Sequence, residues 1–116
     1  MPQILVDHSA ELALDHAALA AELHKAVTEV IDTTLPECKT LFRPAARHTV
    51  GDGASGEALV LVELKILAGR TTAMRAELTA RVLEVLRAHL AGPAAIGVQV
   101  TELDRDTYRF VHHAGR

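Results

Sequence analysis

The fold is decided by the stretch Leu59-Val60-Leu61-Val62-Glu63-Leu64-Lys65-Ile66-Leu67-Ala68-Gly69-Arg70. Its first four residues are all aliphatic, as in a strand that is buried on both faces, and from Glu63 onward charged and apolar residues alternate. We therefore predict a strand over residues 57–67. The last three residues form a short link to a helix, whose N-cap is Thr71 or Thr72.

The helix that follows is predicted over residues 72–91. Apolar residues recur at helical spacing and would form one buried face: Met74, Leu78, Val82, Val85, Leu86 and Leu90. Gly92 and Pro93 end this helix, because glycine is favoured just past a helix and proline cannot continue one. A further strand is expected over residues 95–103, and a short last one over 107–112.

The first half of the chain repeats this order. A strand over 3–7 precedes a helix over about 16–32, with Asp15 as the N-cap, and an irregular strand follows over 40–49. Pro44 cannot donate a hydrogen bond to a ladder, so it implies an edge strand, a bulge or a break. The glycine-rich turn at 51–56 joins the two halves, about 1–50 and 57–106. The chain is therefore predicted as a single α+β domain of two β-α-β units.

Composition excludes several classes of protein. The chain has 116 residues, the length of one ordinary domain, and only 3% aromatic residues, so its core must be aliphatic. The net charge of −3 and the lack of a basic stripe give no reason to expect nucleic acid as a partner. No apolar run approaches the ~20 residues of a membrane helix. Cys38 is the only cysteine, which excludes an internal disulfide and leads us to expect a cytoplasmic protein.

The seven histidines do not form a metal-binding signature. His16 and His24 are too far apart along one helix to share an ion easily, and no HExxH, CxxC or carboxylate array is present. We expect no metal and no cofactor. Cys38 has no activating group beside it in the sequence, so we expect an inert thiol.

Pro2 is the first candidate for chemistry. Methionine aminopeptidases remove Met before proline, and the mature chain would then begin with the secondary amine of Pro2. An α-amino group titrates near 8, and apolar or cationic surroundings lower its pKa toward working pH, where it can act as a general base. The adjacent strand would hold this terminus in place. The alternative is an inert terminus, since Met-Pro starts are common.

Arginines are the candidates for binding an anion. Arg70 lies at the end of a strand and just before a helix N-terminus, where backbone N–H groups and the helix dipole also favour anions. Arg43 and Arg47 flank Pro44 and would bind an anionic substrate together. In each case the alternative is a surface charge that pairs with a carboxylate or is solvated.

Pro2 before an apolar strand, the segment Leu64-Lys65-Ile66-Leu67-Ala68-Gly69-Arg70 before a helix, and an arginine on the preceding irregular strand resemble 5-carboxymethyl-2-hydroxymuconate isomerase. That family belongs to the tautomerase superfamily. The resemblance implies a four-stranded sheet with both helices on one face, and a homotrimer with the sheets facing inward. It also implies a cofactor-independent isomerase in which Pro2 moves a proton on an unsaturated 2-hydroxy or 2-keto acid, such as 5-carboxymethyl-2-hydroxymuconate.

The resemblance also assigns the substrate-binding residues. Arg70 takes the place of the motif arginine, Arg43 that of the strand arginine, and Arg47 is a substitute for Arg43. Two alternatives remain. One is a non-catalytic ferredoxin-like domain that dimerises or binds a small effector, since the same element order fits that fold. The other is a tautomerase-fold protein that has lost catalysis.

Overall fold

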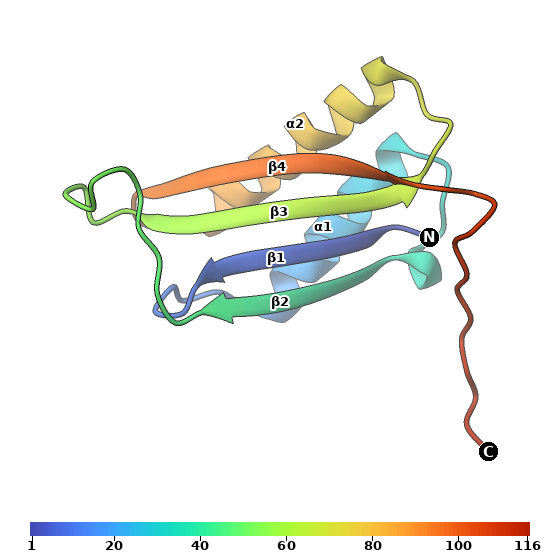
Figure 1. The fold of residues 1–116 in the computed structure, drawn as a ribbon, viewed down its shortest axis with the longest axis horizontal. Coiled ribbons are helices and arrows are strands. Elements are labelled where there is room, and N and C mark those ends of the chain that lie inside the picture. Colours follow the sequence, from blue (N-terminus) through green and yellow to red (C-terminus); the bar gives the residue numbers. More distant parts are fainter.

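One four-stranded sheet with two α-helices on a single face makes up the fold (Figure 1). The computed structural model describes residues 1–116. In chain order the elements are β1 (Gln3–Ser9), α1 (His16–Val30), the 3₁₀ turn η1 (Leu35–Glu37), β2 (Lys39–Ala45), β3 (Ala58–Leu67), α2 (Thr72–His89) and β4 (Ala94–Leu103). The predicted α+β class with two β-α-β units is confirmed.

The strand order β2-β1-β3-β4 places each half of the chain in its own part of the sheet. β1 pairs in parallel with β2, and β3 with β4, while β1 and β3 pair antiparallel at the centre. The two strands of each β-α-β unit are therefore direct neighbours. A ferredoxin-like domain is a split β-α-β, in which another strand lies between them. The ferredoxin-like alternative is therefore wrong.

The hydrophobic core lies between the sheet and the helices. Alternate residues of β1 and β3 point toward the helices, as the period of a strand requires. The core side chains from these two strands are almost completely buried: Ile4, Val6, Val60, Val62, Leu64 and Ile66. The helices contribute Leu19, Leu23, Val27, Leu78, Val82 and Leu86. The core is aliphatic, as the composition predicted.

The opposite face of the sheet is uncovered in the single chain. Leu41 on β2 is 63% exposed and Leu61 on β3 is 48% exposed. The prediction that residues 59–62 are buried on both faces is therefore wrong for one chain. Both crossovers place their helices on the same face, so nothing remains to cover the other one.

β2 and α1 end earlier in the structure than the sequence predicted. β2 ends at Ala45, whose carbonyl accepts from the N–H of Ala10, and residues 46–49 are not in a strand. β2 is an edge strand, so the edge interpretation of Pro44 is confirmed. α1 ends at Val30, because Ile31 is already extended.

The predicted strand over 107–112 is wrong for the single chain. Thr107 and Tyr108 both donate backbone N–H groups to the carbonyl of Asp104, and this turn carries the chain away from β4. The residues after it have no ladder partner and extend from the sheet as a tail (Figure 1).

Side-chain caps start both helices. The carboxylate of Asp15 accepts from the N–H of Ala18 at 3.1 Å, as predicted. The hydroxyl of Thr71 accepts from the N–H of Met74 at 3.1 Å, which makes Thr71 rather than Thr72 the N-cap of α2. Neither helix has the combination of length and hydropathy that crossing a bilayer requires.

Replacing Leu23 by alanine tests the helix-to-sheet core. Leu23 has no exposed surface, so the truncation leaves a cavity and should lower the free energy of unfolding by about 2–5 kcal/mol. Leu35→Ala is the control, because Leu35 is 59% exposed and its truncation should cost less than about 0.5 kcal/mol. Urea unfolding at one fixed chain concentration measures both. Equal losses would contradict this description of the core.

Candidate active site

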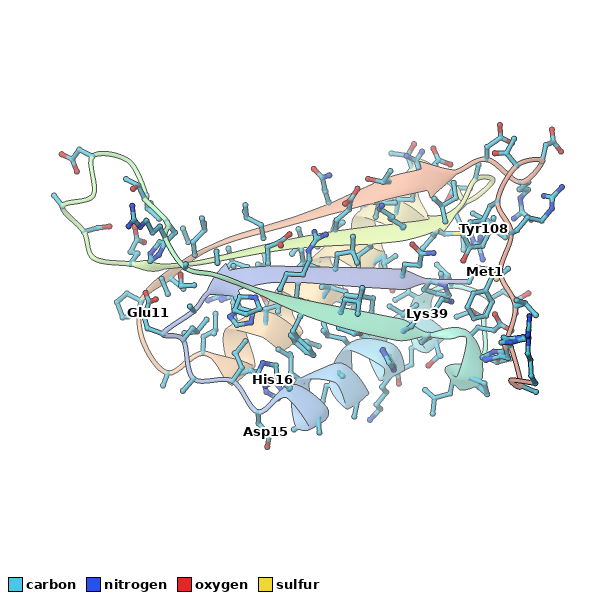
Figure 2. All side chains as sticks on the ribbon, turned by 60° about the horizontal axis from the view of Figure 1, so that its bottom comes forward. Met1, Glu11, Asp15, His16, Lys39 and Tyr108 are labelled. Carbon is cyan, nitrogen blue, oxygen red and sulfur yellow. The ribbon has the colours of Figure 1, made fainter.

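A pocket of about 710 Å³ lies where β1 begins and β3 ends, and these two antiparallel strands place their ends side by side. Its wall comes from the chain terminus, the segment after α1, the β3–α2 link and the turn after β4. The lining residues are Met1, Asp32, Thr33, Thr34, Glu37, Leu67, Gly69, Arg70, Met74 and Arg105. Figure 2 shows Met1 at this end of the sheet, with Lys39 and Tyr108 beside it.

Pro2 follows Met1 directly and is held firmly in place, but it is not itself among the residues that line this pocket. It is buried, and its carbonyl accepts the backbone N–H of Lys39 at 3.3 Å, which extends the β1–β2 ladder to the start of the chain. Met1 precedes Pro2 in the structure, so the nitrogen of Pro2 is an amide there. Met1 is the terminal residue that lines the pocket.

The surroundings of the terminal amine favour its neutral form. Partial burial lowers the pKa of the Met1 amine below its ordinary value of 8.0, and the charge of Lys39 lowers it further. The carboxylate of Glu37, 3.6 Å from the Met1 nitrogen, acts in the opposite direction. The cation that lowers this pKa is thus Lys39, a residue that the sequence analysis did not single out.

Arg70 lies in the same pocket as Met1. Its guanidinium donates to the carbonyl of Leu67 at 3.0 Å and to the carbonyl of Asp32 at 3.3 Å. These contacts join the end of β3 to the segment after α1. No carboxylate is within ion-pair distance of Arg70 in the 116 residues described, so its charge is not neutralised by a salt bridge.

Arg43 and Arg47 are not brought to this pocket by the single chain. Arg43 lies opposite Asp7 in the β1–β2 register and donates from Nε and Nη2 to that carboxylate, both at 2.8 Å. This pairing raises the pKa of Arg43. Arg47 lines a different and smaller hollow, next to His8 and His48. Their role in substrate binding stays a prediction, and either would reach a Met1 pocket only on a neighbouring chain.

Sequence reasoning missed several residues around the site. The β1–β2 register places Lys39 near the terminus, opposite Gln3, but the sequence analysis predicted that this strand begins one residue later. Tyr108 and Phe110 are two of only three Phe and Tyr residues in the chain, which was a usable signal. Gln3 donates to the Tyr108 hydroxyl at 3.0 Å, and the Lys39 ammonium lies 3.8 Å from the Phe110 ring centroid. The tail is thereby attached beside the terminus.

Arg105 was also missed. It follows β4 in the turn at Asp104, and its Nε donates to the carbonyl of Ala68. Its guanidinium packs on Gly69, where a Cβ would lie 3.5 Å from Nε and from Nη2. Gly69 has a φ of +120°, a conformation that favours glycine. The Gly69-Arg70 pair therefore provides one arginine and makes room for a second.

Cys38 is buried behind the site. Its thiol donates to the carbonyl of Thr34 at 3.6 Å, and burial raises its pKa. A raised pKa reduces the thiolate fraction and therefore the reactivity of this cysteine. No three histidine, cysteine or acidic side chains in the chain come close enough together to hold a metal ion.

A sequence model of the 5-carboxymethyl-2-hydroxymuconate isomerase family matches residues 2–110. A search of curated proteins found no match.

Among solved structures, the chain resembles a 5-carboxymethyl-2-hydroxymuconate delta-isomerase, with 19% identity and a TM-score of 0.74 over 97% of this chain and 89% of that chain. It resembles a fused wild-type 4-OT symmetric trimer, with 22% identity and a TM-score of 0.76 over 89% and 86%. It also resembles a macrophage migration inhibitory factor-like protein from Entamoeba histolytica, with 20% identity and a TM-score of 0.75 over 96% of both chains.

The likeness to solved structures shows the tautomerase fold, and the family match extends over nearly the whole length of the chain. The chain belongs to the 5-carboxymethyl-2-hydroxymuconate isomerase family and is an isomerase.

Proposed function

We propose that this protein, after removal of Met1, isomerises an unsaturated 2-hydroxy or 2-keto acid such as 5-carboxymethyl-2-hydroxymuconate, with the Pro2 amine as acid and base and without a cofactor. The observation that carries the proposal is that the chain terminus and Arg70 line one pocket. Family membership supplies the reaction type. The pocket volume, about 710 Å³, is in the range of small-molecule sites.

The proposed reaction moves one proton along a conjugated chain. The neutral amine of Pro2 takes the proton of the 2-hydroxyl group, and the electron pair shifts through the conjugated double bonds. The resulting ammonium returns a proton to a carbon farther along the chain, which leaves a 2-keto acid and the free amine. The Pro2 amine ends in the neutral form in which it began, and the substrate gains and loses one proton. No oxidant, reductant or second substrate is therefore needed.

Two features of the pocket support this role for Pro2. Partial burial and Lys39 already lower the pKa of the amine that occupies the pocket, and a base needs this shift to be neutral near pH 7. Arg70 has no carboxylate partner and would hold a substrate carboxylate and stabilise the charge that develops during the transfer.

The uncovered sheet face supports assembly into a homotrimer with the sheets inward. Leu41 and Leu61 expose aliphatic surface there, and burying such surface drives association. Arg43 lies on the same face, beside Asp7. Assembly would bring Arg43 or Arg47 of one chain toward the pocket of the next, where it would bind the same substrate.

Replacing Pro2 by alanine tests the catalytic amine. The variant keeps Met1 removal but replaces a secondary amine by a primary one, and kcat should fall by about 10²–10⁴-fold, the usual contribution of a positioned base. Turnover of 5-carboxymethyl-2-hydroxymuconate is followed by absorbance, and mass spectrometry checks the terminus. Pro93→Ala, before β4 and away from the pocket, is the control and should retain full activity. Unchanged turnover in Pro2→Ala would refute the mechanism.

The pH profile has a predictable direction. A base must be neutral, so kcat/KM should rise with pH through the amine pKa, at a midpoint below the ordinary value of 8.0. Glu37 raises the pKa of the Met1 amine and Lys39 lowers it, and we expect the same two effects on the Pro2 amine. Glu37→Gln should therefore move the rising limb to lower pH, and Lys39→Gln should move it to higher pH. Shifts in the reverse directions would contradict the proposed electrostatics.

The assembly is tested by placing a charge on the uncovered face. Leu61→Glu should convert the trimer to smaller species, because it would bury a further carboxylate beside Asp7 and Glu63. Ala21→Glu is the control, since Ala21 is exposed on α1, on the other side of the sheet. Light scattering coupled to size-exclusion chromatography gives both masses. A wild-type chain that is monomeric, or a Leu61→Glu variant that remains trimeric, would exclude this interface.

A further inference from the structure

Arg105 is the second arginine of the pocket, and neither the proline nor the Arg70 chemistry uses it. It lines the pocket together with Met1 and Arg70, although it comes from the opposite end of the chain. Arg70 donates to the carbonyl of Leu67 at 3.0 Å and Arg105 donates to the carbonyl of Ala68, the next residue. Successive carbonyls at the end of β3 thus hold the two guanidinium groups.

The two arginines differ in which guanidinium nitrogens have a hydrogen-bond acceptor in the protein. Arg70 uses both terminal nitrogens, Nη1 and Nη2, to bind backbone carbonyls. Arg105 is anchored through Nε alone, and no protein group accepts from its Nη1 or Nη2 among the 116 residues described. Those nitrogens are the end of the guanidinium that binds a carboxylate with two parallel hydrogen bonds.

The nearby carboxylate does not neutralise Arg105. Glu102 lies 3.6 Å from a terminal nitrogen of Arg75 and also accepts the backbone N–H of Gly69 at 3.4 Å. Glu37, on the pocket wall, lies 3.6 Å from the terminal ammonium. Arg105 forms no ion pair with any acidic side chain.

The position of Arg105 depends on its neighbour. Its guanidinium packs at van der Waals distance from the place where a Gly69 side chain would begin. The planar group is therefore supported by the backbone of the β3–α2 link and fixed in direction by the Ala68 carbonyl. Such support reduces the conformational entropy that an arginine loses when it binds an anion.

We propose that Arg105 binds a carboxylate of the substrate other than the one held by Arg70, and so makes the enzyme select acids with at least two carboxylates. The inference rests on the proposed function and deepens it. Arg105 is a specificity-determining residue: it touches a part of the substrate that does not react. Its contribution is therefore to substrate binding, and the proton transfer at Pro2 proceeds without it.

The first test uses the intact enzyme. Arg105→Gln removes the charge, and the KM for 5-carboxymethyl-2-hydroxymuconate should rise roughly 10- to 100-fold, the effect of losing a hydrogen-bonded charge, with kcat changed less than about threefold. The KM for the monoacid 2-hydroxy-2,4-pentadienoate should not change. Arg105→Lys should restore part of the original KM, because lysine retains the positive charge but lacks the two parallel N–H donors of a guanidinium.

The matched control is Arg109→Gln. Arg109 is on the same tail and donates only to the carbonyls of Asp106 and Tyr108, outside the pocket. Its removal should leave both KM values unchanged. An equal rise of KM for 5-carboxymethyl-2-hydroxymuconate and for the monoacid in Arg105→Gln, or no rise at all, would overturn the proposal while the isomerase activity itself stands.

A binding experiment separates this proposal from the proposed function. Calorimetric titration compares hexa-2,4-dienedioate with hexa-2,4-dienoate, which have the same carbon chain and differ in one carboxylate; neither carries the reacting hydroxyl. The wild-type chain should bind the diacid more tightly, and Arg105→Gln should abolish that preference. A wild-type chain without the preference, or a variant that keeps it, would refute the role of Arg105 whether or not the enzyme isomerises any acid.

Discussion

The structure depends on hydrogen bonding of the first strand, β1, to a neighbouring strand on each side. β1 is an inner strand between β2 and β3, and the ladder to β2 extends back to the carbonyl of Pro2. Ile4 and Val6 are completely buried against the helices. Chain termini usually fray, because few contacts offset their conformational entropy. Here pairing and burial hold the first residues in place, so an amine at the terminus would have a fixed position, which proton transfer requires.

The antiparallel pairing of β1 with β3 explains why this fixed terminus has arginines beside it. It places the start of β1 next to the end of β3, where the chain turns through Gly69 into α2. Parallel pairing of β3 with β4 ends both strands at the same edge, so the turn that carries Arg105 is there too. One topology thus gathers the terminus, Arg70 and Arg105 from distant parts of the sequence.

Much of the fold was predictable because local patterns agree with tertiary packing. The alternation after Glu63, the caps Asp15 and Thr71, and Pro44 on an edge strand all correspond to features of the structure. The predictions failed where a residue's state depends on a partner that the pattern does not contain. Leu61 was expected to be buried but has no covering layer in one chain, and residues 107–112 resemble a strand but have no ladder to join. For the site, the sequence predicted Pro2 and Arg70, whose roles stay proposals, whereas Glu37, Lys39 and Arg105 are near the terminus only through strand register and turn geometry.

The central claim is that the mature chain presents the neutral secondary amine of Pro2 to this pocket. The most direct measurement is a titration of the Pro2 nitrogen by ¹⁵N NMR in the protein purified after Met1 removal. The account predicts an amine signal that titrates with a pKa below the ordinary α-amino value near 8, because of partial burial and Lys39. An amide signal that does not titrate, or an amine with an unshifted or raised pKa, would contradict it.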